Sequence, residues 1–133
     1  MVKMKKHIRV VGAVIVEDGK VLCAQRPADK NLPLKWEFPG GKIEDDESHE
    51  DALIRELQEE LDCTIEVLDS IDTTVYEYDF GIVELTTYYA KVVESTVRNL
   101  EHHALRWVER QALHELDWAP ADIPAIKKIQ ENV

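Results

Sequence analysis

Residues 41–63 read GKIEDDESHEDALIRELQEELDC and hold the clearest helix signal in the chain. Ser48 is a residue type that caps helices, and Asp51 stands three residues later, in the position of a capping box. Leucines recur every fourth residue and form one apolar stripe, made of Leu53, Leu57 and Leu61. We therefore predict an amphipathic helix over residues 48–61. Asp62 should turn the chain after this helix, because Asp tolerates left-handed geometry better than most residues.

Three carboxylates converge on the predicted helix. Glu56, Glu59 and Glu60 stand three and four residues apart, which places them on one face. Glu60 projects only about 20° from Leu53, so its carboxylate should be partly desolvated. Unpaired like charges this close raise the energy of a fold, and hard oxygen ligands suit Mg²⁺ or Mn²⁺. The other interpretation is an ordinary solvated acidic face, since Glu is a common helix former.

The negative charge of the chain is concentrated in the same segment. The chain has 133 residues and a formal net charge of −11. Ten of its 27 acidic residues lie within residues 44–62, where Arg55 is the one basic residue. This balance argues against a nucleic-acid polymer as partner, because such polymers bind Lys and Arg surfaces. A small phosphorylated ligand remains compatible with it, since a bound cation can reverse the local charge. The length fits one domain over residues 1–133.

The rest of the pattern predicts a mixed α/β fold. Two β-branched stretches flank Asp18 and Gly19, which form a typical hairpin turn. Pro39, Gly40 and Gly41 are expected to forbid regular structure. We predict strands over residues 8–17, 21–25, 64–79, 82–93 and 104–109, and helices over residues 110–116 and 121–131. Strand pairs interleaved with helices favour a mixed sandwich over a doubly wound parallel sheet.

The cysteines and the N-terminal segment bear on the compartment. Cys23 and Cys63 are fewer than a secreted disulfide framework usually contains. The basic N-terminal segment lacks a small-residue cleavage site, and no apolar stretch approaches the roughly 20 residues that span a bilayer. We expect reduced thiols, a cytoplasmic location and no membrane partner.

The acidic segment also carries a long fixed pattern. Gly41 is followed after five residues by Glu47, and after seven more by Arg-Glu-Leu-x-Glu-Glu, which begins at Arg55. This resembles the Nudix box, G-x5-E-x7-R-E-U-x-E-E-x-G-U, in which U is a bulky aliphatic residue. Every charged position matches. The departures are Asp62 in place of the last glycine and Cys63 in place of the last aliphatic residue.

Two further stretches resemble the MutT-type branch of the Nudix family. Residues 24–42 contain Trp-Glu-Phe-Pro before the glycines. Residues 101–124, which begin EHHALRWV and contain APADIP, are similar to a bacterial group described as CTP pyrophosphohydrolases. The resemblance implies the α/β (α+β) class and the Nudix fold, with a mixed β-sheet in an α/β/α sandwich.

The resemblance implies a metal site at the box. Mg²⁺, or Mn²⁺ in its place, would be bound by carboxylates and by a backbone carbonyl, drawn from Glu56, Glu59, Glu60, Gly40 and Gly41. Arg55 would pair with Glu47 and orient the helix against the loop, although a surface salt bridge is the alternative. Glu101 would be a further metal ligand or the general base, or else an ordinary loop glutamate. Glu59 is the other candidate for the base.

The same resemblance points to residues that contact the nucleotide. Phe38 would stack on the base or belong to the core. Asp122 occupies the place where MutT-type proteins read the base; ionised, it would only accept hydrogen bonds and would favour an amino group such as that of cytosine. Its alternative role is a helix cap. Arg26 would reach a phosphate or sugar. His102 and His103 lack metal-site spacing and are expected to be solvated or packing residues.

The function implied by the resemblance is Mg²⁺-dependent hydrolysis of a nucleoside triphosphate to a nucleoside monophosphate and pyrophosphate. Modified or oxidised nucleotides, including cytosine nucleotides and 8-oxo-dGTP, are the expected substrates. One alternative is a Nudix hydrolase of an NDP-sugar or a dinucleoside polyphosphate, and another is a non-catalytic nucleotide-binding module. We expect a monomer or a homodimer.

Overall fold

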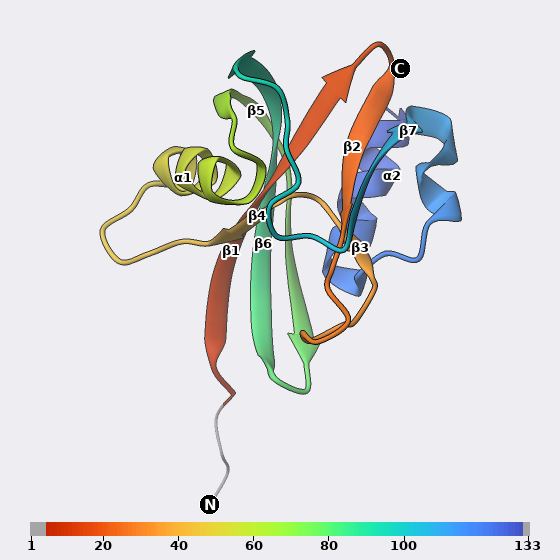
Figure 1. The fold of residues 1–133 in the computed structure, drawn as a ribbon. Helices are drawn as coiled ribbons and strands as arrows, with labels where there is room; N and C mark the ends of the chain where they lie inside the picture. Colours follow the sequence, from red (N-terminus) through yellow and green to blue (C-terminus); the bar gives the residue numbers. More distant parts are fainter. Residues whose placement is uncertain (1–4, 132–133) are drawn as a thin grey trace, which may run out of the picture.

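Seven strands form one mixed sheet in the computed structural model, which describes residues 5–131 (Figure 1). The strands are β1 (His7–Glu17), β2 (Lys20–Gln25), β3 (Trp36–Glu37), β4 (Gly40–Lys42), β5 (Thr64–Tyr78), β6 (Gly81–Glu94) and β7 (Ala104–Glu109). Their order is β3-β2-β1-β6-β5, while β4 pairs with β1 and β7 pairs with β2. β1 and β6 run parallel, and the other strand pairs are antiparallel. Parallel neighbours need a long crossover, and here it contains α1 (His49–Leu61).

The two α-helices cover opposite faces of this sheet (Figure 1). Side chains alternate between the faces of a strand, and β1 is therefore buried on both sides. Val11, Ala13 and Ile15 pack in one cluster with the leucines of α1. Val14 packs in a second cluster with α2 (Ile123–Glu131). The expected α/β/α sandwich with a mixed sheet is confirmed.

Both ends of α1 follow the sequence prediction. The Ser48 hydroxyl accepts a hydrogen bond from the Asp51 N–H at 3.1 Å. Asp62 adopts a left-handed conformation with φ of 52°, and its N–H donates to the Gln58 carbonyl. The helix is therefore held at each end by local contacts, which fixes the direction of the carboxylates it carries.

The expectation that Pro39, Gly40 and Gly41 forbid regular structure is wrong. The two glycines lie in β4, which pairs with β1. A Cβ at Gly40 would collide with the Val11 carbonyl, so only glycine permits this close approach. Pro39 has no N–H to place in the sheet, and its carbonyl accepts from the Ala13 N–H at 2.8 Å. The glycine segment is thus part of the sheet, directly beside α1.

The remaining helices, turns and cysteines resemble the sequence prediction, with small differences in helix type. Asp18 and Gly19 join β1 to β2 with positive φ at both residues, as a hairpin turn requires. The predicted short helix at residues 110–116 is a 3₁₀ helix, Arg110–Glu115, and a second one, Pro120–Asp122, precedes α2. Both cysteines are free and buried. Within residues 5–131, neither α-helix has the length and apolar character needed to cross a membrane.

Candidate active site

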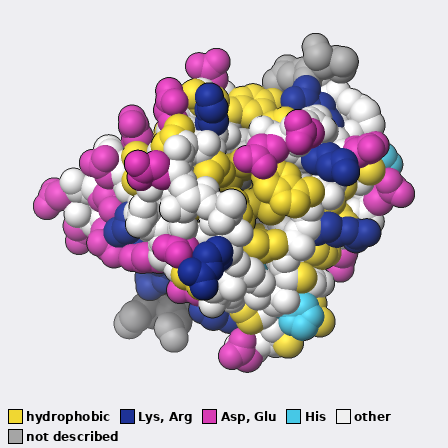
Figure 2. All heavy atoms as spheres, turned by 45° about the horizontal axis from the view of Figure 1, so that its top comes forward, with side chains coloured by type: hydrophobic (Ala, Val, Ile, Leu, Met, Phe, Trp, Pro, Cys, Tyr) yellow, Lys and Arg dark blue, Asp and Glu magenta, His cyan; other side chains and the backbone are white. Residues whose placement is uncertain are grey.

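A cavity of about 940 Å³ brings together segments that are far apart in the sequence. All the predicted site residues except Glu47 line it. One set of lining side chains is acidic and consists of Glu56, Glu59, Glu60 and Glu101, while a second set includes Arg26, Phe38 and Asp122. Figure 2 shows acidic side chains gathered on the left, over α1 and the loop before it. The volume is in the range of small-molecule sites.

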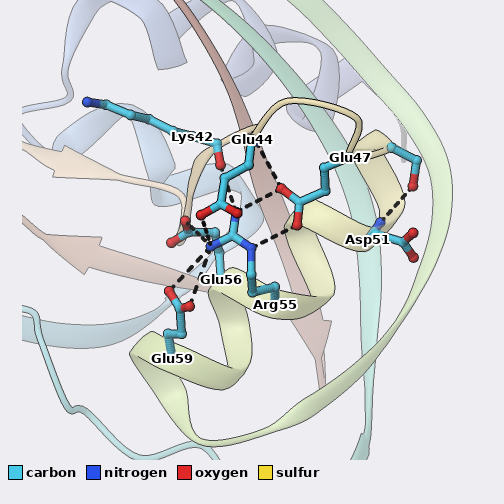
Figure 3. Close-up of polar contacts among 8 residues, drawn as sticks. Lys42, Glu44, Glu47, Asp51, Arg55, Glu56 and Glu59 are labelled. Carbon is cyan, nitrogen blue, oxygen red and sulfur yellow. Dashed lines mark hydrogen bonds and ion pairs between the residues drawn. The ribbon is translucent and has the colours of Figure 1, made fainter.

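Arg55 connects the acidic side chains of α1 with the preceding loop (Figure 3). Its guanidinium binds Glu47 through two hydrogen bonds, with Nε at 2.8 Å from Oε2 and Nη2 at 2.9 Å from Oε1. Nη2 also donates to the Lys42 carbonyl at 2.9 Å. Nη1 lies 2.9 Å from Glu56 and 3.4 Å from Glu59. One cation therefore holds the loop, β4 and two box carboxylates in a fixed arrangement.

The Arg55–Glu47 pair stays ionised over the ordinary pH range. The hydrogen bonds from Arg55 lower the pKa of Glu47 to about 2, and those to Glu47 raise the pKa of Arg55 further above its usual value. Charged, two-point contacts of this kind fix orientation as well as adding energy. The pair is therefore well suited to positioning the helix.

Glu60 is buried among other carboxylates. Glu60 is 8% exposed, and its Oε2 accepts a hydrogen bond from the Gly40 N–H at 3.3 Å. Burial, together with the negative charges of Glu37 and Glu56, raises the pKa of Glu60 to about 9. Burial also raises the pKa of Glu56. The prediction that Glu60 is desolvated is confirmed, and its carboxyl group is costly to ionise without a nearby cation.

Glu101 reaches this acidic set from the loop between β6 and β7. The loop is tied to the end of α1 by the Arg98 N–H, which donates to the Leu61 carbonyl at 2.8 Å. The Leu100 N–H donates to the Glu60 carbonyl at 3.0 Å. Glu101 itself is exposed, and its charge raises the pKa values of both Glu56 and Glu60. The structure therefore places Glu101 beside the box carboxylates.

Asp122 and Phe38 meet on the other side of the cavity. The Phe38 N–H donates to Asp122 Oδ2 at 3.0 Å. The Phe38 ring is 4% exposed and lies 4.8 Å from the Trp118 ring, in the core cluster beneath α2. This burial favours the core interpretation of Phe38 over base stacking.

Asp122 differs chemically from the ionised acceptor expected from the sequence. It is 5% exposed, and burial together with the charge of Glu37 raises its pKa well above the usual range. The carboxyl group is therefore favoured in its neutral form, which both donates and accepts hydrogen bonds. Because Phe38 donates to Oδ2, the proton is best placed on Oδ1.

Comparisons with known proteins agree with this geometry. The family described as NUDIX domain matches residues 5–129. The chain belongs to the Nudix family. It is a Nudix hydrolase by its relatives: "CTP pyrophosphohydrolase" of Escherichia coli is 40% identical over 92% of this chain and 90% of its own length, and "8-oxo-dGTP diphosphatase" of the same species is 32% identical over 96% and 98%. A solution structure of the Nudix hydrolase MutT from Staphylococcus aureus is 52% identical, with a TM-score of 0.81 over 98% of this chain and all of that one.

Nudix hydrolases use divalent metal ions, and the donor chemistry of this site fits such an ion. Hard carboxylate oxygens from α1 face the backbone of β4. A Cβ at Gly41 would collide with the Glu56 carboxylate, so the glycine leaves room for that group. Within residues 5–131, no three acidic, His or Cys side chains are already arranged as a closed metal site. In Figure 3, Glu56 and Glu59 are turned toward Arg55.

Sequence reasoning missed two residues of this Nudix site, the half-buried Glu37 and His102. Glu37 pairs with Arg26 at 2.9 Å, and its charge acts on both Glu60 and Asp122. The side chain of His102 is 4% exposed and faces the same carboxylates. Burial lowers the pKa of His102 to about 4. Glu37 could have been found from its place two residues before Pro39 and the glycines. His102 offered only its position next to Glu101, and that does not distinguish it from His103.

Proposed function

We propose that this chain hydrolyses nucleoside triphosphates to the nucleoside monophosphate and pyrophosphate in a Mg²⁺-dependent reaction, with cytosine nucleotides and 8-oxo-dGTP as substrates. One observation carries the proposal: a single cavity joins the carboxylates of α1 to the buried Asp122. The α1 carboxylates suit a metal ion that binds the triphosphate. Asp122 suits the hydrogen-bonding edge of a base. The names of the two Escherichia coli relatives support both substrate classes.

The carboxylates would divide the chemistry at the phosphate. Glu56 and Glu60, with Glu59 or Glu101, would hold the metal ion, which when bound neutralises phosphate charge and acidifies water. Glu59 and Glu101 are the two groups exposed enough to pass a proton to solvent. One of them would accept the proton of the attacking water. Arg55 would keep Glu56 and Glu59 in place before the metal is bound.

A neutral Asp122 would read one hydrogen-bond pattern that two bases share. Cytosine presents its N4 amino donor beside the N3 acceptor, and 8-oxoguanine presents an N7–H donor beside the O6 acceptor. One acid O–H and one C=O match both pairs, whereas unmodified guanine presents two acceptors, N7 and O6, on that edge. Arg26 lines the same cavity and would contact a phosphate or sugar.

The direct test is a substrate panel with product analysis. The purified chain is incubated with unmodified, methylated, hydroxylated and 8-oxo nucleoside triphosphates in Mg²⁺, in Mn²⁺ and with a chelator, and products are identified by ³¹P NMR. We expect pyrophosphate and a nucleoside monophosphate as products. Their formation should stop in chelator, and Glu60→Gln should lower its rate by orders of magnitude. If the chain released sugar phosphate from an NDP-sugar and turned over no triphosphate, NDP-sugars would replace triphosphates as the proposed substrates. No turnover of any nucleotide would show a binding module.

Base reading is tested at Asp122. Asn keeps one donor and one acceptor, so Asp122→Asn should change the ratio of kcat/KM for CTP and 8-oxo-dGTP by less than about tenfold. Asp122→Leu removes both groups and should lower kcat/KM for each substrate by about 10–100-fold. A large shift of Asp122→Asn toward 8-oxo-dGTP would instead show that Asp122 acts as an ionised acceptor.

A further inference from the structure

The side chain of His102 lies between two carboxylates that come from different elements. Its Nε2 is 3.6 Å from Glu60 Oε2 on α1 and 3.9 Å from Glu37 Oε2 on β3. Its Nδ1 is buried and has no hydrogen-bond partner within residues 5–131. Both Nε2 distances are longer than a hydrogen bond, but an N–H facing carboxylate oxygens is favourable, so we place the ring proton on Nε2.

The backbone around His102 is fixed on both sides. The Asn99 side chain accepts from the His102 N–H and donates to the His102 carbonyl, each at 2.9 Å. The next residue, His103, donates its N–H to the Gln25 carbonyl of β2 at 2.9 Å. The loop that carries the His102 ring is therefore not free to move. It is held in place by contacts within the loop and to the sheet.

We propose that His102 is a positioning residue that holds the Glu60 carboxylate in place for metal binding through its Nε2–H. The inference rests on the proposed function, because it concerns the metal site of that reaction. Glu60 has few other restraints: Gly40 donates one hydrogen bond of 3.3 Å, and Arg55 pairs with Glu47, Glu56 and Glu59 instead.

His102 also connects the metal site to the second set of cavity residues. Glu37, which it faces, forms an ion pair with Arg26 at 2.9 Å. Glu60, His102, Glu37 and Arg26 therefore lie in a row, with the Glu37–Arg26 ion pair at one end. Removing the donor at His102 should loosen Glu60 and leave the Arg55 contacts of Glu56 and Glu59 unchanged.

A matched pair of variants separates this role from simple packing. In His102→Gln, the side-chain Nε2 donor lies the same number of bonds from Cα as in histidine. In His102→Met, a methyl group takes that position, with similar length and no donor. His103→Met is the control, since His103 is the exposed neighbour on the same loop. Mn²⁺ binding is measured by electron paramagnetic resonance, alongside kcat, KM and the melting temperature in chelator.

Contacts that orient metal ligands typically contribute 10–100-fold in affinity. We expect His102→Met to weaken Mn²⁺ binding by at least tenfold and to lower kcat more than it changes KM. His102→Gln should stay within about threefold of wild type, as should His103→Met. Equal Mn²⁺ affinity in His102→Met and wild type would overturn this inference alone, as would equal losses in the Gln and Met variants. A wild-type chain that binds no Mn²⁺ would overturn the proposed function and this inference together.

Discussion

Replacing Glu60 by Gln should stabilise the metal-free chain while removing its activity. Glu60 is 8% exposed, and burial with the charges of Glu37 and Glu56 raises its pKa to about 9. At neutral pH the folded chain must therefore take up a proton or bury an unpaired charge. Gln has nearly the same size, carries no charge and retains an oxygen for the Gly40 N–H. It avoids the electrostatic cost and keeps the packing.

The size of the effect follows from the two pKa values. An unfolded Glu titrates near 4.5, whereas the folded Glu60 titrates near 9. Between these values the folded state binds more protons than the unfolded state, so the free energy of unfolding falls as pH rises. The loss is at most about 1.4 kcal/mol per pH unit, which gives about 3 kcal/mol by pH 7. Glu60→Gln should recover about 2–3 kcal/mol, or roughly 10 °C in melting temperature.

The assay is a set of thermal and urea melts in chelator at several pH values. Wild type and Glu60→Gln should have similar stability near pH 4.5 and separate progressively toward pH 8. Glu66→Gln makes the same change at an exposed position on β5, away from the site, and serves as the control. Saturating Mn²⁺ should then stabilise wild type and not Glu60→Gln, because a ligand of the folded state adds stability by mass action. A variant no more stable than wild type at pH 8, in chelator, would refute the reasoning.

Three other substitutions and one labelling experiment follow from the same contacts. Arg55→Lys keeps the charge but loses the two-point contact with Glu47, so kcat should fall about 10–100-fold, measured at saturating substrate. Gly41→Ala places a Cβ against the Glu56 carboxylate and should lower kcat/KM about 100-fold, with little change in the urea midpoint. Asp62→Gly relieves a left-handed conformation and should raise the free energy of unfolding by about 1 kcal/mol in urea titrations; an unchanged value would show that Asp62 is unstrained. Burial raises the pKa of Cys23 to about 12, so a thiol reagent should label it only after denaturation.

Much of the fold could be predicted because local signals were strong where the structure is regular. The leucine stripe, the Ser48 cap and the Asp62 turn define α1 without tertiary information. The Asp18-Gly19 turn likewise sets the first hairpin. β3 and β4 could not be predicted, since they have two and three residues and exist only through their pairing with β2 and β1. A glycine pair normally indicates a turn, and only the Val11 carbonyl beneath it explains a strand there.

In the candidate site, too, some residues could be predicted from local spacing and others depend on tertiary contacts. The box carboxylates share one helix face, so spacing alone brought Glu56, Glu59 and Glu60 together. The roles of Glu37 and His102 depend on burial created by the β3 pairing and by the loop before β7, which no spacing encodes. Burial likewise raises the pKa of Asp122, which no spacing encodes either. Sequence patterns proposed Asp122 as a site residue, whereas the folded environment sets the direction of its pKa shift and so the hydrogen bonds that it favours.

The concentration of charge therefore has a structural consequence that composition could not show. The acids of residues 44–62 are not equivalent: Glu47 is stabilised as an anion by Arg55, whereas Glu60 is destabilised as one by burial. Ionising Glu60 requires a nearby cation. Arg55 does not supply it, because the contacts of Arg55 go to other carboxylates. A divalent ion would supply that charge and stabilise the folded state at the same time. Metal binding, proton release and stability should thus be coupled at Glu60, and the coupling should disappear in Glu60→Gln.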